Sequence, residues 1–487
     1  MAKTTKLSTG QTVLFAIGFI IMFGVKFLPA PWGMTADAFQ VLGVVIGGLM
    51  MLFVTVGLSS IMIFLALSTV PALGVGTVAV QSFGNSTFML MMFIFMFSSV
   101  LDKRGIAKRI AIGLMTNKIG RKGPWYTVTM IFIAAFIVGS FLGSALSLMI
   151  FLPILVQIFR ETGSNSPGEK NQITSLLVSG VAICVCIAQC GTPIGHTITI
   201  YGMRAYEQYT GGTLDFGTYC AISLPIAILT VIAWCLIARF IWKPDLSALR
   251  GLNYDTLRGE LTKMSRGDII TTVIYILVIV AWVLPGISRY LIPSLYESFF
   301  SKIDDNIPAM IGIIALCLIR ADGKPLITYD ELLKTVPLKT ILYMAAILGL
   351  SGCVNNADVG LSAWLAQVLG GAFSGMGVVT FVIVIVTICI IATNFMPNMV
   401  VVTLGMAVAM PLMTSIYEGQ LNPMVVGALI TAAGSYAYAA PSACPTAAIA
   451  CGSGWIDSGD LFKYGMISAV TAIIFSCVVG IPLGMAM

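Results

Sequence analysis

The sequence predicts an all-α polytopic membrane protein, because apolar residues are abundant, charge is scarce and the apolar segments are long. Hydrophobic residues make up 58% of the 487 residues and charged residues only 9%, unlike soluble globular domains. The longest polar stretch runs roughly from 243 to 268, which is too short for a soluble catalytic domain. The net charge of +6 does not indicate nucleic-acid binding, since the basic residues lie in short segments between apolar runs.

Thirteen apolar segments are long enough to span or enter a bilayer. They lie at residues 11–29, 38–57, 58–75, 84–101, 124–159, 172–203, 219–242, 269–288, 307–319, 340–356, 376–412, 424–456 and 464–487. Segments 124–159 and 376–412 are too long for one helix and have small or helix-breaking residues near the middle, which predicts two re-entrant hairpins. Segments 172–203 and 424–456 are interrupted by Gly and Pro, which predicts two broken helices. Non-helical backbone at bilayer depth needs protein or a water-filled cavity beside it, so we expect the site there.

The second half of the chain repeats helix-breaking residues of the first half at a nearly constant offset. The offset is 255 for Gly105 and Gly360, 258 for Pro153 and Pro411, and 252 for Pro193 and Pro445. Each repeat holds five spanning helices and one hairpin, and because five is odd the second repeat must be inverted. This is the plan of secondary transporters, in which paired discontinuous helices meet near the bilayer midplane.

The repeat divides the chain into four predicted regions. These are N-terminal scaffold helices (1–79), a first inverted repeat (80–243), a cytoplasmic linker (244–268) and a second inverted repeat (269–487).

Basic residues predict the orientation of the chain in a cell membrane. With the N-terminus in the cytoplasm, all but four of the 26 Lys and Arg residues fall on the inner side. The four exceptions are Lys26, Arg204, Arg289 and Lys302. The C-terminus is then expected outside.

The hairpins and broken segments contain no Asp, Glu, Lys or Arg, and His196 is the one ionisable group there apart from Cys and Tyr. A proton antiporter, a voltage sensor or a membrane-embedded enzyme would be expected to place such groups at bilayer depth, so these classes are disfavoured. An anion would instead be held by backbone amides at half-helix N-termini and by hydroxyl or amide side chains. The hairpin tips and breaks supply Ser140, Ser144, Ser147, Thr192, Thr393, Asn394, Asn398 and Thr403.

Each polar candidate also has a structural interpretation. Asn394 and Asn398 can cap helices in a hairpin turn, Thr192 and Ser144 can bond to carbonyl groups of a broken helix, and His196 can be a hydrogen-bonded spacer. The eleven cysteines lie mostly in apolar runs and are expected to be packing thiols rather than disulfides or metal ligands.

Three stretches resemble the divalent anion/sodium symporter (DASS) family, of the dicarboxylate transporter type. They are GNSTFMLMMFIFMFSSVLDKRGIAKRIA at 84–111, GTPIG at 191–195 and APSACPTAAIACGSGWIDSGD at 440–460. The resemblance implies eleven transmembrane helices, two hairpins, a homodimer formed by scaffold helices and elevator-type movement of the domain that bears the hairpins.

The resemblance also implies site residues, although the family's Ser-Asn-Thr triplet at each hairpin tip is changed. The first triplet becomes Gly143-Ser144-Ala145, and the second becomes Pro397-Asn398-Met399 or Val401-Val402-Thr403. Of the family's two Thr-Pro pairs, Thr192-Pro193 is intact and the second is Cys444-Pro445. The implied substrate-binding set is Ser144, Ala145, Thr192, Pro193, Asn398, Met399, Cys444 and Pro445. The implied sodium set is Gly139, Gly143, Ser144, Gly191, Thr393, Asn398 and Ala443.

The sequence therefore predicts a secondary active transporter of small divalent anions rather than an enzyme. C4-dicarboxylates such as succinate, malate or fumarate are the expected substrates, carried by sodium symport or by anion exchange. Sulfate or a tricarboxylate is an alternative substrate, and a proton-coupled anion carrier or a channel is an alternative mechanism. Expected partners are the anion, membrane lipid and a second copy of the chain, with a sodium ion as the coupling ion, no other cofactor and no nucleic acid.

Overall fold

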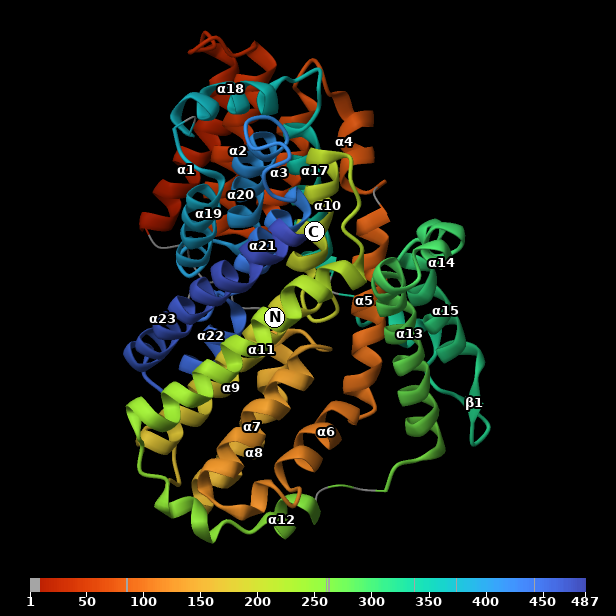
Figure 1. Cartoon of the computed structure of the whole chain (residues 1–487), viewed down its shortest axis with the longest axis vertical. Helices are drawn as coiled ribbons and strands as arrows, with labels where there is room; N and C mark the ends of the chain where they lie inside the picture. Colours follow the sequence, from red (N-terminus) through yellow and green to blue (C-terminus); the bar gives the residue numbers. More distant parts are fainter. Residues whose placement is uncertain are drawn as a thin grey trace.

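A computed structural model describes residues 9–84, 86–259, 261, 263–336, 338–373, 375–441 and 443–487. Lys3 and Lys6, two of the basic residues that predict an inner N-terminus, lie outside the described residues. Within the described ranges the chain is helical apart from loops and one pair of two-residue strands (Figure 1). Seven of the described helices are long and apolar enough to cross a membrane. Helix length alone does not yield the eleven transmembrane helices that the resemblance implies, because the hairpins and broken segments divide the chain into shorter apolar helices.

Four N-terminal helices gather at one end of the molecule (Figure 1). They are α1 (Thr9–Gly24), α2 (Ala36–Val54), α3 (Val56–Ser68) and α4 (Gly74–Ser82). The boundary expected between the segments 38–57 and 58–75 lies slightly earlier, because extended Thr55, with φ −149° and ψ 124°, separates α2 from α3. The domain boundary expected after residue 79 falls inside α4, and the first helix of the repeated series begins at Ser86.

Two series of helices follow the same order, as the sequence repeat predicts. The first series is α5 (Ser86–Lys103), α6 (Ile106–Met115), α7 (Pro124–Gly139), α8 (Ser144–Glu161), α9 (Gln172–Gly191), α10 (Thr197–Thr210) and α11 (Phe216–Ile237). The second series is α17 (Leu338–Val354), α18 (Leu361–Phe373), α19 (Val378–Ala392), α20 (Asn398–Met413), α21 (Pro423–Ala433), α22 (Pro445–Gly452) and α23 (Ser458–Phe475). In each series a spanning helix is followed by an arm, a two-helix hairpin, a broken helix and a final helix.

The remaining elements connect or extend these series. The connection comprises α12 (Tyr254–Gly259), α13 (Arg266–Leu291), α14 (Pro293–Ser298), α15 (Asn306–Leu318), β1 (Arg320–Ala321), β2 (Lys324–Pro325) and α16 (Tyr329–Leu333), and α24 (Ile481–Ala486) lies near the C-terminus. Short 3-10 or π turns occupy Val25–Phe27, Gly120–Lys122, Ala238–Trp242, Ser247–Gly251, Phe300–Lys302 and Ser476–Gly480. The predicted linker 244–268 thus contains its own short helix and the first turn of α13.

The arms α6 and α18 begin with the same backbone device. Gly105 precedes α6 with φ +63° and Gly360 precedes α18 with φ +75°, a left-handed conformation that side chains with a Cβ rarely adopt. Both glycines reverse the chain between a spanning helix and its arm. This matched geometry, 255 residues apart, is local evidence that the two series are related by an internal repeat.

The hairpins enter the molecule from different ends. In Figure 1 the pair α7 and α8 lies in the lower part and the pair α19 and α20 in the upper part. Between them runs α9, in which every residue from Ile173 to Gly191 is buried. The helix α13, by contrast, exposes a row of apolar side chains that includes Ile269, Val273 and Ile276, as expected of a surface that faces lipid.

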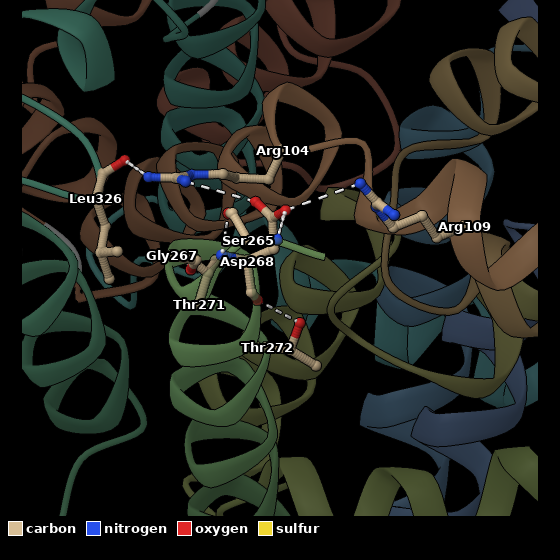
Figure 2. Close-up of polar contacts among 8 residues, drawn as sticks. All are labelled: Arg104, Arg109, Ser265, Gly267, Asp268, Thr271, Thr272 and Leu326. Carbon is tan, nitrogen blue, oxygen red and sulfur yellow. Dashed lines mark hydrogen bonds and ion pairs between the residues drawn. The ribbon is translucent and has the colours of Figure 1, made fainter. Parts of the chain in front are cut away.

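A charged cluster joins the first series to the connecting region (Figure 2). The guanidinium of Arg104 lies 3.5 Å from one carboxylate oxygen of Asp268, and that of Arg109 lies 3.8 Å from the other. Arg104 also donates to the carbonyl oxygen of Leu326. Asp268 in turn forms a capping box with Ser265 at the start of α13. The buried carboxylate of Asp268 thus fixes the α5–α6 turn to the start of α13.

A second ion pair supports the same turn from α16. The ammonium of Lys103 donates to Glu331, and this hydrogen bond together with those from Thr328 lowers the pKa of the Glu331 carboxyl to about 2. The pair is half-exposed, so it contributes little to stability, but it holds the C-terminal end of α5 against α16.

Replacing either reversal glycine should weaken the fold through backbone strain alone. Gly105→Ala and Gly360→Ala are each expected to destabilise the protein by about 1 kcal/mol, because alanine is forced to a positive φ. Thermal unfolding of the purified protein in detergent measures the effect. Gly113→Ala is the matched control, since Gly113 lies inside α6 with open space at its Cβ, and should stabilise by a few tenths of a kcal/mol or more. Equal midpoints for Gly105→Ala and Gly113→Ala would contradict the proposed strain.

Candidate functional site

The hairpin tips and helix breaks border one cavity of about 580 Å³, a volume typical of small-molecule sites. From the first series the cavity is lined by Ser144 of α8, Gln189 of α9 and His196 in the break before α10. From the second series it is lined by Pro397, Asn398, Met399, Ser435, Ala443, Cys444 and Pro445. Segments far apart in the sequence therefore meet at one place, as the sequence predicts for a site between two repeats.

Four helices begin at the cavity wall. Their first residues are Ser144 of α8, Thr197 of α10, Asn398 of α20 and Pro445 of α22, and all four residues line the cavity. The first N–H groups of a helix have no partner within the helix and carry the positive end of its dipole. Pro445 has no N–H, so α22 contributes amides only from its second residue onward. None of the lining residues that the structure describes is Asp, Glu, Lys or Arg, so these helix ends are the source of positive potential.

The first break, residues 192–196, is fixed against the tip of the first hairpin. The hydroxyl of Thr192 donates to the carbonyl oxygen of Ser140 at 2.6 Å, and the side-chain amide of Gln189 donates to the carbonyl oxygen of Gly195 at 2.7 Å. A Cβ on Gly195 would lie 2.4 Å from the carbonyl oxygen of Gly139, so only glycine permits this approach. The non-helical backbone is thus satisfied by neighbouring protein, which is the condition for such backbone at membrane depth.

The second break, residues 434–444, is held chiefly by one asparagine of the second hairpin. The side chain of Asn394 is fully buried and makes four hydrogen bonds. Its oxygen accepts from the backbone N–H groups of Tyr438 and Ala439 at 3.0 and 2.8 Å. Its nitrogen donates to the carbonyl oxygens of Ile390 and Tyr436 at 2.8 and 3.1 Å. Asn394 therefore has the structural role that the sequence left open, and it holds backbone rather than capping a helix.

Asn398 differs from Asn394 although only four positions separate them. It begins α20, lines the cavity and is 8% exposed, and its carbonyl oxygen has no hydrogen-bond partner in the described part of the chain. A buried oxygen without a partner costs free energy unless a ligand supplies a donor or a cation. The side chain of Asn398 is therefore available to a molecule in the cavity.

His196 and Ser435 join the two breaks at the cavity wall. Their Nδ1 and Oγ atoms lie 2.7 Å apart, and the two residues come from opposite halves of the chain. This contact agrees with the interpretation of His196 as a hydrogen-bonded spacer, with its ring on the cavity wall.

The structure brings together part of the substrate-binding set that the resemblance implies. Ser144, Asn398, Met399, Cys444 and Pro445 line the cavity, whereas Ala145, Thr192 and Pro193 are not among its lining residues. Thr192 has its hydroxyl on Ser140, so its place is behind the wall. Of the two possible second triplets, Pro397-Asn398-Met399 lines the cavity, while the hydroxyl of Thr403 contacts Tyr201 and the carbonyl oxygen of Met399. Ser442, expected outside the contact set, lies outside the described residues.

The sodium set is divided in the same way. Ser144, Asn398 and Ala443 line the cavity, and Gly139, Gly143, Gly191 and Thr393 lie behind it. The hydroxyl of buried Thr393 donates to the carbonyl oxygen of Gly434 at 2.9 Å, which leaves its lone pairs for a cation. The described residues contain no group of three His, Cys, Asp or Glu that could hold a metal ion, so the available ligands are hydroxyl, amide and carbonyl oxygens. Such hard ligands fit an alkali ion, and the sodium site stays a prediction.

Several lining residues were missed by the sequence analysis. They are Leu52 of α2 and Thr340, Tyr343 and Met344 of α17. Their segments look like ordinary spanning helices, so nothing in them signals a site. Gln189 was also missed, although a glutamine inside a helix that is otherwise apolar and entirely buried is a usable signal.

Comparison with known proteins decides the family. The family model described as the sodium:sulfate symporter transmembrane region matches residues 9–487. The chain belongs to this family. The family predicted from the three resembling stretches is thereby confirmed, and the chain is a multi-pass membrane transporter rather than an enzyme.

The relatives of this chain are distant. The L-tartrate/succinate antiporter of Escherichia coli strain K12 is 22% identical over 420 residues, which cover 83% of this chain and 79% of that protein. An uncharacterised transporter of Schizosaccharomyces pombe is 22% identical over 328 residues, which cover 66% of this chain but only 33% of that longer protein.

One solved structure is similar in fold. The YdaH transporter of Alcanivorax borkumensis matches with a TM-score of 0.57 at 11% identity, covering 98% of this chain and 99% of that chain. At this identity the likeness concerns the fold alone. It agrees with the all-α polytopic architecture that the composition predicts.

The two hairpin asparagines should respond differently to truncation. Asn394→Ala removes partners from two buried N–H groups and two carbonyl groups, at about 1 to 3 kcal/mol for each group left unsatisfied, and should abolish or strongly reduce folded yield. Asn398→Ala removes an oxygen that has no partner and should leave yield and thermal midpoint near wild type. Size-exclusion monodispersity and thermal unfolding in detergent measure both variants. Equal losses in the two variants would contradict the division into a structural and a ligand-facing asparagine.

Proposed function

We propose that the protein is a secondary active transporter of small divalent anions, and that C4-dicarboxylates such as succinate, malate and fumarate bind in the cavity between the hairpin tips. The observation that carries this proposal is the convergence of four helix N-termini on a cavity whose described lining residues include no Asp, Glu, Lys or Arg. Such a site attracts anions through backbone amides and dipoles. Membership of the sodium:sulfate symporter family supports an anion as substrate.

The arrangement of the helix ends supports a substrate with negative charge at both ends. Two of the four N-termini, those of α8 and α10, belong to the first series, and those of α20 and α22 belong to the second. A carboxylate at each end of a four-carbon chain can meet one pair each, whereas sulfate concentrates its charge at one centre. The name of the E. coli relative, an L-tartrate/succinate antiporter, points to the same substrate class. Sulfate and tricarboxylates remain the alternatives that a transport assay must compare.

The coupling mode is either sodium symport or exchange of one dicarboxylate for another. The family description supports symport, whereas the relative's name and the altered triplets, which lack an asparagine at Gly143-Ser144-Ala145, support exchange. We propose exchange and symport as the two cases to separate, with hydroxyl and carbonyl oxygens near Thr393 and Asn398 as the cation ligands in the symport case. Proton coupling is disfavoured because His196 is engaged with Ser435.

The lining residues on α2 and α17 also support a proposed direction of opening. Leu52 is near the end of α2, and Thr340 and Tyr343 are near the start of α17. With the N-terminus inside, both positions are at the cytoplasmic ends of their helices, which favours a cavity that opens inward. Homodimer assembly and elevator-type movement remain predictions from the family resemblance.

Uptake into proteoliposomes tests the substrate and the coupling together. Labelled succinate should enter faster than labelled sulfate or citrate, and unlabelled dicarboxylates should compete. A sodium gradient should accelerate uptake if the transporter is a symporter, and internal dicarboxylate should accelerate it if the transporter is an exchanger. Uptake of sulfate but not of any dicarboxylate would contradict the proposed substrate class.

Asn398→Ala connects this uptake to the cavity. Loss of one hydrogen-bond partner at a partly desolvated site costs about 1 to 3 kcal/mol, or roughly a five- to more than one-hundred-fold weaker apparent affinity for succinate. Gly113→Ala, on the remote arm α6, is the matched control and should transport with wild-type affinity. Wild-type succinate affinity in folded Asn398→Ala would place the substrate elsewhere.

The proposed orientation predicts which loops are accessible from each side. Ser247→Cys in the 244–268 linker should react with a membrane-impermeant maleimide only after cells are opened, and Asp358→Cys should react on intact cells. Both side chains are exposed, and the unmodified chain is the control for its own cysteines. Reaction of both introduced cysteines from the same side would refute the inverted topology.

A further inference from the structure

Two thiols from opposite halves of the chain meet at the cavity wall. Cys186 lies on α9 and Cys444 is the N-cap residue of α22, and their sulfur atoms are 3.9 Å apart. Both side chains line the cavity, and both are free thiols in the structure. The sequence predicts packing thiols. A pair of sulfur atoms on the cavity wall can also react with a molecule that enters the cavity.

The distance lies within reach of a disulfide. An S–S bond is about 2.05 Å long, so the two sulfurs must approach each other by roughly 2 Å to form one. Cys186 is 2% exposed, whereas Cys444 is partly exposed, so an oxidant in the cavity meets Cys444 first. The backbone N–H of Ala447 donates to the sulfur of Cys444 at 3.3 Å. A thiol at a helix N-terminus is favoured as thiolate, the form that reacts with peroxides.

We propose that Cys186 and Cys444 form a reversible disulfide in response to a peroxide, and that this bond closes the anion site. The Cys444 thiolate attacks one peroxide oxygen and becomes a sulfenic acid, while the other oxygen leaves as hydroxide and is protonated to water. The Cys186 thiol then attacks the Cys444 sulfur, the S–S bond forms, and the sulfenic oxygen leaves as a second water. The two thiols lose two electrons in total and hydrogen peroxide is reduced to two molecules of water.

Oxidation changes the site at two points. The Cys444 sulfur is drawn toward Cys186, so α22 loses the acceptor that caps its amide at Ala447. The bond also ties the start of α22 to α9 across the wall that these helices share. Because α22 supplies one of the four helix ends around the cavity, the disulfide should weaken anion binding. This effect on transport rests on the proposed function, whereas formation of the bond does not.

The experiment treats the full-length protein with hydrogen peroxide, in detergent and in proteoliposomes. A digest analysed by mass spectrometry under non-reducing conditions should contain a peptide pair linked through Cys186 and Cys444, and dithiothreitol should remove it. Succinate uptake should fall at least tenfold after peroxide and recover after dithiothreitol. Cys186→Ala and Cys186→Val should each keep most of their own untreated uptake after peroxide. Cys451→Ala, a matched control on the same short helix, should stay as sensitive as wild type.

The outcomes separate the thiol pair from the proposed function. Saturating succinate should slow formation of the linked peptide pair at least several-fold, because it occupies the cavity that the oxidant must enter. A linked pair that forms at the same rate with every dicarboxylate would support the thiol pair but count against dicarboxylates as the substrate. Oxidation of other cysteines without a Cys186–Cys444 pair would overturn the inference, as would peroxide inhibition that persists in both Cys186 variants. A quantitative Cys186–Cys444 bond with unchanged uptake would overturn closure of the site.

Discussion

The fold depends on hydrogen bonds to the backbone groups of non-helical segments inside an apolar protein. In the second half of the chain, the buried side-chain amide of Asn394 makes most of these hydrogen bonds. The break at 434–444 exposes backbone groups where the hydrocarbon core offers no water, and each unsatisfied group there would cost several kcal/mol. The side-chain oxygen of Asn394 accepts hydrogen bonds from two backbone N–H groups, and its nitrogen donates to two carbonyl oxygens. Among uncharged side chains, only asparagine and glutamine carry two N–H donors and an acceptor oxygen on one planar group, and glutamine is one methylene longer. With the break held, α22 can begin at the cavity and direct its amides inward.

The first half solves the same problem with different residues because its break is shorter. Thr192 and Gln189 satisfy carbonyl groups of the hairpin tip and of the break, and Gly195 lets the two backbones approach closely. The hydroxyl of Tyr219 adds a hydrogen bond to the carbonyl oxygen of Cys190 at 2.6 Å, at the end of α9. The repeat is therefore conserved in its geometry, with paired hairpins and breaks, more than in its side chains. This explains how altered triplets are compatible with an intact fold.

The architecture could be predicted from the sequence where it follows from covalent properties of the chain. Glycines at 105 and 360, prolines near the breaks and the length of the apolar runs indicated the hairpins and the broken helices, and these features need no tertiary information. The sequence predicted a boundary between the segments 38–57 and 58–75, but its position at Thr55 was not predicted, because one extended residue between two apolar runs leaves no compositional mark. The number of complete spans is equally hard to read from hydropathy, since hairpin helices such as α8 are as apolar as spanning helices.

The site could be predicted only in part, for a different physical reason. Asn398 was identified because an amide side chain in an apolar hairpin tip needs a hydrogen-bond partner. The same argument applied to Asn394, whose side chain forms its hydrogen bonds with backbone groups instead. Which of the two faces the cavity depends on the helix phase after Pro397, so sequence alone cannot separate them. Thr192 was expected at the substrate, yet its hydroxyl is directed to Ser140 by the packing of a distant hairpin. Leu52 of α2 and Tyr343 of α17 reach the cavity through tertiary packing, which local sequence does not encode.

A site built from helix ends alone sets the charge of its ligand. Each helix N-terminus is equivalent to roughly +0.5 elementary charge, so four of them offer about +2, which matches a dicarboxylate dianion. A lysine or arginine in place of one end would add a full, mobile charge and hold the anion more tightly. Tight binding impedes release, and a carrier must release its substrate on the other side of the membrane. Fixed partial charges, spread over two hairpins and two breaks, attract a dianion without binding it so tightly that its release is impeded. The absence of Lys and Arg among the described lining residues is thus a property suited to transport rather than a weakness of the site.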